Sequence, residues 1–183
     1  MQIQRSLKKA MKDPQSVQGL DLRQVKPVLL FAEIDQFINL EFIDLSNCPD
    51  LDWKDACIKL ATLPKLTEIK AFGAEVKVLP EEFGLLRHLK KIDFASNGEL
   101  TKLPESFGNL TALEDISFYG CGLEMLTETA WDFPGLQSLS LSRNKLNRLP
   151  ENFFSTLPAL QALAIADNQL ESLPESICGL KKS

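Results

Sequence analysis

The sequence lacks the residue groupings on which most enzyme chemistry depends. Its 183 residues include one histidine, His88, so no second imidazole is present to share a metal ion or complete a triad. Neither GxGxxG nor GxxxxGKS/T occurs, which leaves phosphate binding by a glycine-rich loop without support. Carboxylates are frequent but are spread along the chain. We therefore expect a protein that is not an enzyme and has no cofactor and no metal site.

The four cysteines are separated from one another, and no CxxC pair occurs. The zinc-binding and redox motifs built on that spacing are therefore absent. We interpret Cys48 and Cys121 as buried free thiols, which are typical of a reducing compartment.

Charge of one sign and long apolar runs are also scarce. Twenty Lys and Arg against 25 Asp and Glu give a net charge of −5, which argues against a nucleic-acid partner. No 18 consecutive apolar residues occur, so no membrane insertion is predicted. Because no secretory signal is visible, we expect a cytoplasmic protein, with export by another route as the alternative.

A repeated apolar pattern runs through most of the chain. Residues 136–146 read LxxLxLxxNxL, and residues 160–170 repeat this pattern with one isoleucine. In seven copies the first, fourth and sixth positions are all apolar. The copies start at Val17, Leu40, Leu66, Leu89, Leu113, Leu136 and Leu160.

The second half of most copies carries another motif, Leu-Pro followed by spaced apolar residues. It begins at Leu79, Leu103, Leu149 and Leu173. The alternating first motif predicts a short strand, and stacked copies predict a parallel sheet. The proline of the second motif suits the first turn of a short helical segment.

Both motifs resemble the leucine-rich repeat family, in the LP-type variety of about 23 residues found in short bacterial and intracellular proteins. The resemblance covers about residues 17–180. It implies an α/β solenoid: a right-handed curved coil with a parallel sheet on its concave face and short helices, 3-10 turns and loops on its convex face. A polar residue after each strand is expected to satisfy backbone groups there. We call these positions after the strands the seam; they are occupied by Cys48, Asn97, Cys121, Asn144 and Asn168.

The pattern divides the chain into a capping helix over residues 1–16 and a leucine-rich repeat domain of about seven repeats over 17–183. Helical spacing predicts further helices over 51–60 and 27–38. No polar cap follows Leu180, so we expect either a longer array or a second copy of the chain covering that edge.

Side chains at the third, fifth, seventh and eighth positions of each copy are predicted to face the concave groove. Phe72, Ala95 and Tyr119 share one column on adjacent coils, and exposed aromatic residues often anchor protein interfaces. Local packing of these rings is the alternative, and the charged residues could equally support the sheet. The predicted partner-binding residues are Phe42, Asp44, Glu68, Lys70, Phe72, Lys91, Asp93, Asp115, Ser117, Tyr119, Ser140 and Arg143.

The sequence thus predicts a non-catalytic scaffold that binds a partner protein on its concave face. Two alternatives remain open. The chain could be the recognition module of a larger enzyme or exported bacterial effector, or it could self-assemble as a homodimer through its C-terminal edge.

Overall fold

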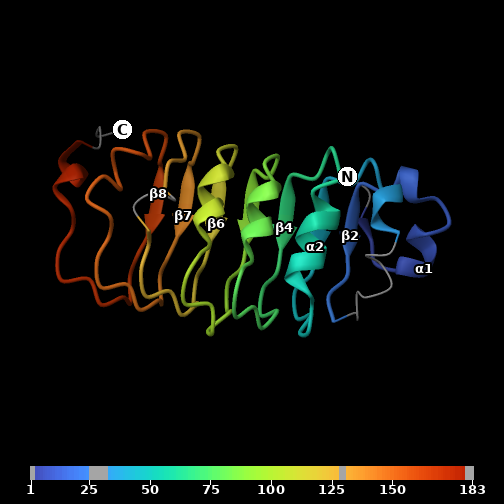
Figure 1. Ribbon diagram of the computed structural model, residues 1–183, viewed down its shortest axis with the longest axis horizontal. Coiled ribbons are helices and arrows are strands. Elements are labelled where there is room, and N and C mark those ends of the chain that lie inside the picture. The colour runs from blue at the N-terminus through green and yellow to red at the C-terminus, as the bar shows by residue number, and fades with distance from the viewer. Residues whose placement is uncertain (1–2, 25–32, 128–130, 180–183) are drawn as a thin grey trace.

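The computed structural model describes residues 3–24, 33–127 and 131–179. Eight short strands form one parallel sheet in chain order, and Figure 1 shows them side by side along the long axis of the molecule. The strands are β1 Ile3–Gln4, β2 Gly19–Asp21, β3 Phe42–Asp44, β4 Glu68–Lys70, β5 Lys91–Asp93, β6 Asp115–Ser117, β7 Ser138–Ser140 and β8 Ala162–Ala164.

The register of the strands follows the apolar pattern. The middle residue of each strand from β2 onward is apolar, and Leu20, Ile43 and Ile69 are aligned across β2, β3 and β4. Because alternate side chains of a strand point to opposite faces, this alignment directs one continuous row into the core. The predicted strand positions and the solenoid architecture are confirmed. We call one strand with its returning segment a coil.

Most returning segments contain a short helix, whereas the described residues between β6 and β7 and between β7 and β8 form only turns and loops. The helices are α1 Leu7–Ala10, η1 Pro14–Ser16, η3 Ile34–Gln36, α2 Trp53–Leu60, η4 Glu81–Leu85, η5 Glu105–Asn109 and η6 Glu175–Gly179, where η marks a 3-10 helix. Helix α2 confirms the helix predicted over 51–60. It begins after Asp52, whose carboxylate accepts the N–H groups of Lys54 and Asp55 at 3.0 and 3.1 Å.

Aromatic side chains fill the space between sheet and returning segments. The rings of Phe94 and Phe118 come from the strand side, and those of Phe83 and Phe107 come from η4 and η5. Neighbouring ring centroids among these four lie 5.5–6.2 Å apart. Contacts of this kind continue through Trp131 toward the C-terminal coils. The coils therefore share one continuous core, as expected for stacked repeats.

The N-terminal segment differs from the single helix predicted over 1–16. Residues Ile3–Gln4 form β1, which pairs with β2, and only Leu7–Ala10 are α-helical. Gly19 permits this pairing, because a Cβ atom at that position would lie 3.1 Å from Ile3 Cγ1. Of the helix predicted over 27–38, residues 27–32 lie outside the described residues, and the described part contains η3.

The predicted role of the seam is confirmed at its asparagines. Asn144 donates hydrogen bonds to the carbonyls of Phe118 and Leu141 at 2.8 and 2.9 Å, and its Oδ1 accepts the N–H of Leu123 at 3.0 Å. Asn97 and Asn168 make the corresponding bonds in their own coils. At Cys121 a thiol instead donates to the carbonyl of Phe94. Seam side chains thus tie each of these coils to the preceding one.

Candidate functional site

The side chains that point away from the core form the open sheet face, which carries the predicted site. Strand register aligns Glu68, Lys91 and Asp115 in one row. Lys70, Asp93 and Ser117 form the next row. Of the twelve predicted residues, the exposed ones are Phe72, Lys91, Tyr119 and Arg143, the half-buried ones are Glu68, Lys70, Asp93, Asp115, Ser117 and Ser140, and the buried ones are Phe42 and Asp44.

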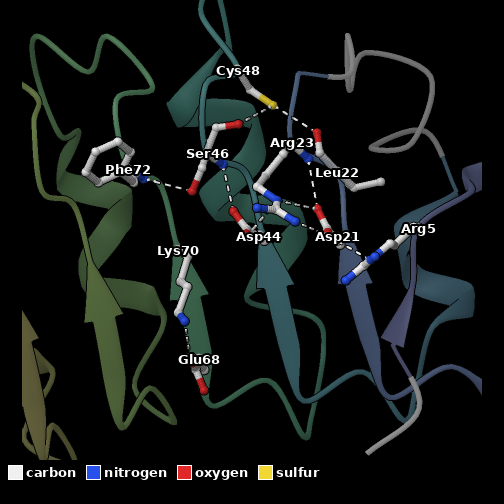
Figure 2. Close-up of polar contacts among 10 residues, drawn as sticks. All are labelled: Arg5, Asp21, Leu22, Arg23, Asp44, Ser46, Cys48, Glu68, Lys70 and Phe72. Atoms are coloured by element: carbon white, nitrogen blue, oxygen red, sulfur yellow. Dashed lines mark hydrogen bonds and ion pairs between the residues drawn. The ribbon is translucent and has the colours of Figure 1, made fainter.

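The charges at the N-terminal end of the open sheet face are paired with one another. Figure 2 shows Arg23 between Asp21 and Asp44, with N–O distances of 2.8 and 3.6 Å, and Arg5 on the far side of Asp21. Hydrogen bonding from the Arg23 side chain lowers the pKa of Asp21 below its ordinary value. The charges of Arg5, Arg23, Asp21 and Asp44 are therefore neutralised by one another. Their ion pairs would have to break before these groups could bind a charged partner.

Phe42 and Asp44 do not have the exposure that a binding residue requires. The ring of Phe42 is 7% exposed; it lies against Gly19 and beneath the ammonium of Lys70, which is 5.6 Å from the ring centroid. The carboxylate of Asp44 accepts the N–H of Ser46 at 2.9 Å. Both residues therefore have a structural role at this end of the sheet, and the expectation of an exposed Phe42 is wrong.

A hydrogen bond from a backbone N–H to an aspartate carboxylate, like that of Asp44, also occurs in a central coil. Asp93 Oδ1 accepts the N–H of Ala95 at 3.1 Å, so this side chain also shapes the end of its strand. The repeat pattern predicted that Asp44 and Asp93 lie on the open sheet face. It did not predict that each carboxylate accepts a hydrogen bond from the backbone N–H two residues later.

The two exposed aromatic residues lie on either side of one small residue. Phe72 is 46% exposed and Tyr119 37% exposed, while Ala95 on the coil between them is 7% exposed. The Phe72 N–H donates to Ser46 Oγ at 3.1 Å (Figure 2), and the Arg143 guanidinium lies 5.5 Å from the Tyr119 ring centroid. Neighbouring coils thus hold the backbone of Phe72 and cover one side of the Tyr119 ring.

A cavity of about 270 Å³ lies over the two rows of strand residues, and neither Phe72 nor Tyr119 is among its lining residues. Glu68, Lys70, Lys91, Asp93, Asp115 and Ser117 are among its lining residues. Lys70 pairs with Glu68 of the same strand at 3.6 Å. Within the described part of the chain, Lys91, Asp93 and Asp115 form no ion pair.

A second region with cavities, around Val78 and Pro80, was not predicted as a binding site from the sequence. Two cavities of about 440 Å³ share Val78 and Pro80 as lining residues. Val78 is 61% exposed and stands just before its Leu-Pro pair, where Lys102 and Arg148 stand in other coils. An apolar residue at an otherwise polar repeat position is the signal that could have revealed it.

Within the described part of the chain, the histidine and the cysteines lie apart from one another. His88 is exposed in a turn, and Cys57 and Cys121 are buried free thiols. Cys48 is buried and its thiol donates a hydrogen bond to the carbonyl of Leu22. Burial raises the pKa of Cys57 to about 12 and that of Cys121 to about 11, which keeps both thiols protonated and unreactive. No cluster of three metal-binding side chains is found among the described residues. Over the same residues, no helix has the length and apolar character needed to cross a membrane.

Sequence comparison points to one family in two parts of the chain. A family model described as leucine rich repeat matches residues 134–183, and a second such model matches residues 88–110. Comparison with curated proteins gives no match.

Solved structures of the same architecture resemble this chain. A leucine-rich repeat protein of Leptospira interrogans has a TM-score of 0.81 at 25% identity, covering 99% of this chain and 51% of that one. TLR13 in complex with ssRNA13 has a TM-score of 0.69 at 28% identity, covering 87% and 23%. An internalin, InlF of Listeria monocytogenes, has a TM-score of 0.70 at 14% identity, covering 97% and 49%.

This chain spans about half or less of the length of the proteins in those three structures. The proteins share its parallel sheet of short stacked coils, and the family models match the same repeat that sets the strand register. The chain is a leucine-rich repeat protein.

Proposed function

We propose that this chain is a non-catalytic scaffold that binds another protein on its open sheet face, with Phe72 and Tyr119 as the anchors. The observation that carries the proposal is a contrast in exposure. Every other phenylalanine and tryptophan among the described residues is buried, whereas these two rings are exposed on one face, two coils apart. Leucine-rich repeat proteins are typically interaction scaffolds, which supports the same conclusion.

Exposed aromatic rings on a rigid sheet suit binding for energetic reasons. Burying a large aromatic side chain contributes most when little else must become ordered, and the strands already hold these residues in position. Ser117 and Ser140 are half-buried in the neighbouring row and add polar groups beside the rings. The other predicted residues that are exposed or half-buried, from Glu68 to Arg143, contribute complementarity, whereas the buried Phe42 and Asp44 do not take part.

The partner we propose is a protein rather than a nucleic acid. The net charge is −5, and basic residues on the open sheet face are largely paired with acids. Because TLR13 is seen in complex with ssRNA13, a single-stranded RNA is the appropriate control ligand. The buried free thiols support a reducing compartment such as the cytoplasm as the place of action.

The test is a double variant, Phe72→Ala with Tyr119→Ala, compared with Val78→Ala and Leu85→Ala, which remove exposed apolar residues elsewhere. Partners are isolated by cross-linking in lysate, and the affinity of each purified partner is then measured for all variants. We expect the double variant to weaken binding by about 2 kcal/mol or more, with little change in the controls.

Thermal unfolding of each variant checks that the coils remain folded. Affinity that is unchanged in a folded double variant, or lost equally in the control variants, would remove the open sheet face from consideration.

Self-association through the C-terminal coil is a second candidate function. Strand β8 pairs with β7 on one side only among the described strands, and Leu163 and Ile165 of this coil are only partly buried. A strand edge with apolar neighbours can pair with a second copy. Sedimentation equilibrium over a range of concentrations tests this candidate, and Leu163→Lys should reduce any dimer that forms.

A further inference from the structure

We propose that the cavity between the start of α2 and residues 74–80 binds a small organic cation, a protonated amine carried on an apolar group. The cavity has a volume of about 440 Å³, within the range of small-molecule sites. This inference goes beyond the proposed function, because none of the lining residues belongs to a strand of the open sheet face. It combines an apolar lining, an acidic rim and an unusual backbone conformation at one place.

The first argument is the apolar lining, which comes from two successive coils. Val78 is 61% exposed, although the same position before the Leu-Pro pair holds Lys102 and Arg148 in other coils. An apolar group that covers such a side chain removes both surfaces from water, which favours binding. The apolar lining residues are Leu51, Trp53, Ala74, Val76, Val78 and Pro80.

The second argument is that the basic residues of the lining are already paired. Lys54 Nζ lies 3.2 Å from Glu82 Oε1, and Lys77 Nζ lies 3.0 Å from Glu99 Oε2. Neither glutamate is among the lining residues. An anionic ligand would therefore have to compete with an existing ion pair for each of the two lysines.

The acidic residues of the lining, in contrast, form no ion pair with a described residue. They are Asp50, Asp52 and Glu75, and all three are exposed. The Asp52 carboxylate accepts the N–H groups of Lys54 and Asp55, so these two donors at the start of α2 are also occupied. The cavity thus offers carboxylates to a cation, and charge-assisted hydrogen bonds are the strong kind.

The third argument is the backbone conformation of two of these acids. Nine described residues have a positive φ, and seven of them stand at the eighth position of their repeat. The two exceptions are Asp50, with φ 65°, and Glu75, with φ 56°, and both line this cavity. Residues with a side chain adopt this conformation rarely, and it is concentrated at functional sites. The local backbone, and not the repeat, therefore brings both carboxylates to the cavity.

A protonated amine on an apolar group satisfies the lining and the rim together. Its apolar part contacts Val78 and its neighbours, and its ammonium donates to the carboxylates of Asp50 and Glu75. A neutral apolar molecule would leave these carboxylates without a partner. An anion of the same shape would be repelled by them.

Three probes with the same apolar body test the inference on the intact chain: 2-phenylethylammonium, the neutral 2-phenylethanol and the anionic 3-phenylpropionate. Binding is followed by NMR of backbone amides and of the two indole N–H groups. We expect the amine to shift the signals of Val76, Val78 and Trp53, while the indole of the fully buried Trp131 stays unchanged. The amine should bind about fivefold more tightly than the alcohol, and the carboxylate should bind most weakly.

Two variants test the rim and the lining separately. Asp50→Asn with Glu75→Asn removes two charges, and asparagine tolerates a positive φ; this variant should bind the amine only as tightly as the alcohol. Val78→Lys introduces the residue type of other coils and should weaken amine binding about tenfold. Asp132→Asn and Leu85→Lys make the same kinds of change away from the cavity, and their affinities should be unchanged. The same spectra show whether each variant is folded.

The inference is overturned if the alcohol binds as tightly as the amine, if the carboxylate binds more tightly, or if the shifted signals all lie outside the cavity. It is also overturned if about 10 mM amine shifts neither Val76 nor Val78. The variant with Phe72→Ala and Tyr119→Ala should bind the amine like the wild type. Failure of amine binding would therefore leave the proposed protein binding in place, and loss of protein binding would leave this cavity in place.

Discussion

The open sheet face divides into an N-terminal part and a central part that use similar residues differently. In the N-terminal part the aromatic residue Phe42 is buried and the carboxylates of Asp21 and Asp44 are paired with Arg23. In the central part the rings of Phe72 and Tyr119 are exposed, and Lys91, Asp93 and Asp115 have no ion pair with described residues. Similar side chains can therefore stabilise the fold in one coil and remain available to a partner in another.

The largest expected effect tests this contrast directly. Phe42→Ala should lower the free energy of unfolding by about 3 kcal/mol, because it removes a buried ring. Phe72→Ala, just beyond the end of a neighbouring strand and half exposed, should lower it by about 1 kcal/mol or less. Guanidinium denaturation followed by circular dichroism measures both. Equal losses would mean that the two aromatic residues contribute alike to stability and that the contrast is false.

A smaller loss of stability is expected for substitutions in the seam. Here the comparison is between two neighbouring coils, one with an asparagine and one with a cysteine at the seam position. Asn144→Ala should cost about 2–3 kcal/mol, because it leaves two carbonyls and one N–H without their buried partner. Cys121→Ala removes one thiol hydrogen bond and should cost about 1 kcal/mol. Denaturation of the two variants under the same conditions gives the difference. A larger loss at Cys121 would show that packing, and not hydrogen bonding, governs the seam.

The smallest effect concerns acid stability of the N-terminal part. The pKa of Asp21 is lowered in the fold, so its ionised form stabilises the native state at pH values above the ordinary pKa of 3.8. That contribution is lost as the pH falls through the lowered pKa. Because Arg23 is half exposed, Asp21→Asn should remove under about 1 kcal/mol at neutral pH, and less in high salt.

Urea denaturation of the wild type and Asp21→Asn from pH 7 to pH 3 measures this contribution. The two curves should converge at the acid end. A difference that grows as the pH falls would contradict the proposed role of the Arg23 pair.

Features that depend on the repeat itself could be predicted from the sequence. The apolar positions around Ile43 and Ile69 specify strands and their register, and the helical spacing of Trp53, Cys57 and Leu60 specifies α2. Such patterns are local, and each coil repeats the same packing problem, so the sequence signal is reinforced along the array.

Features that depend on which residues meet across coils could not be predicted in the same way. Strand β1 pairs with β2 because Gly19 leaves room for the side chain of Ile3. This contact lies outside the repeat pattern, so the pattern does not predict it. The burial of Phe42 follows from Gly19 and from the position of the Lys70 side chain. Tertiary contacts of this kind join residues on different coils, far apart in the sequence.

By itself, the sequence determined that the chain is a stack of short coils with a parallel sheet and a dry core, because alternating apolar residues at a constant period have one efficient way to be buried. Tertiary structure alone decided which side chains on the open sheet face remain exposed. The reason is that exposure there depends on the size and charge of residues on the neighbouring coils, which the repeat pattern leaves free to vary.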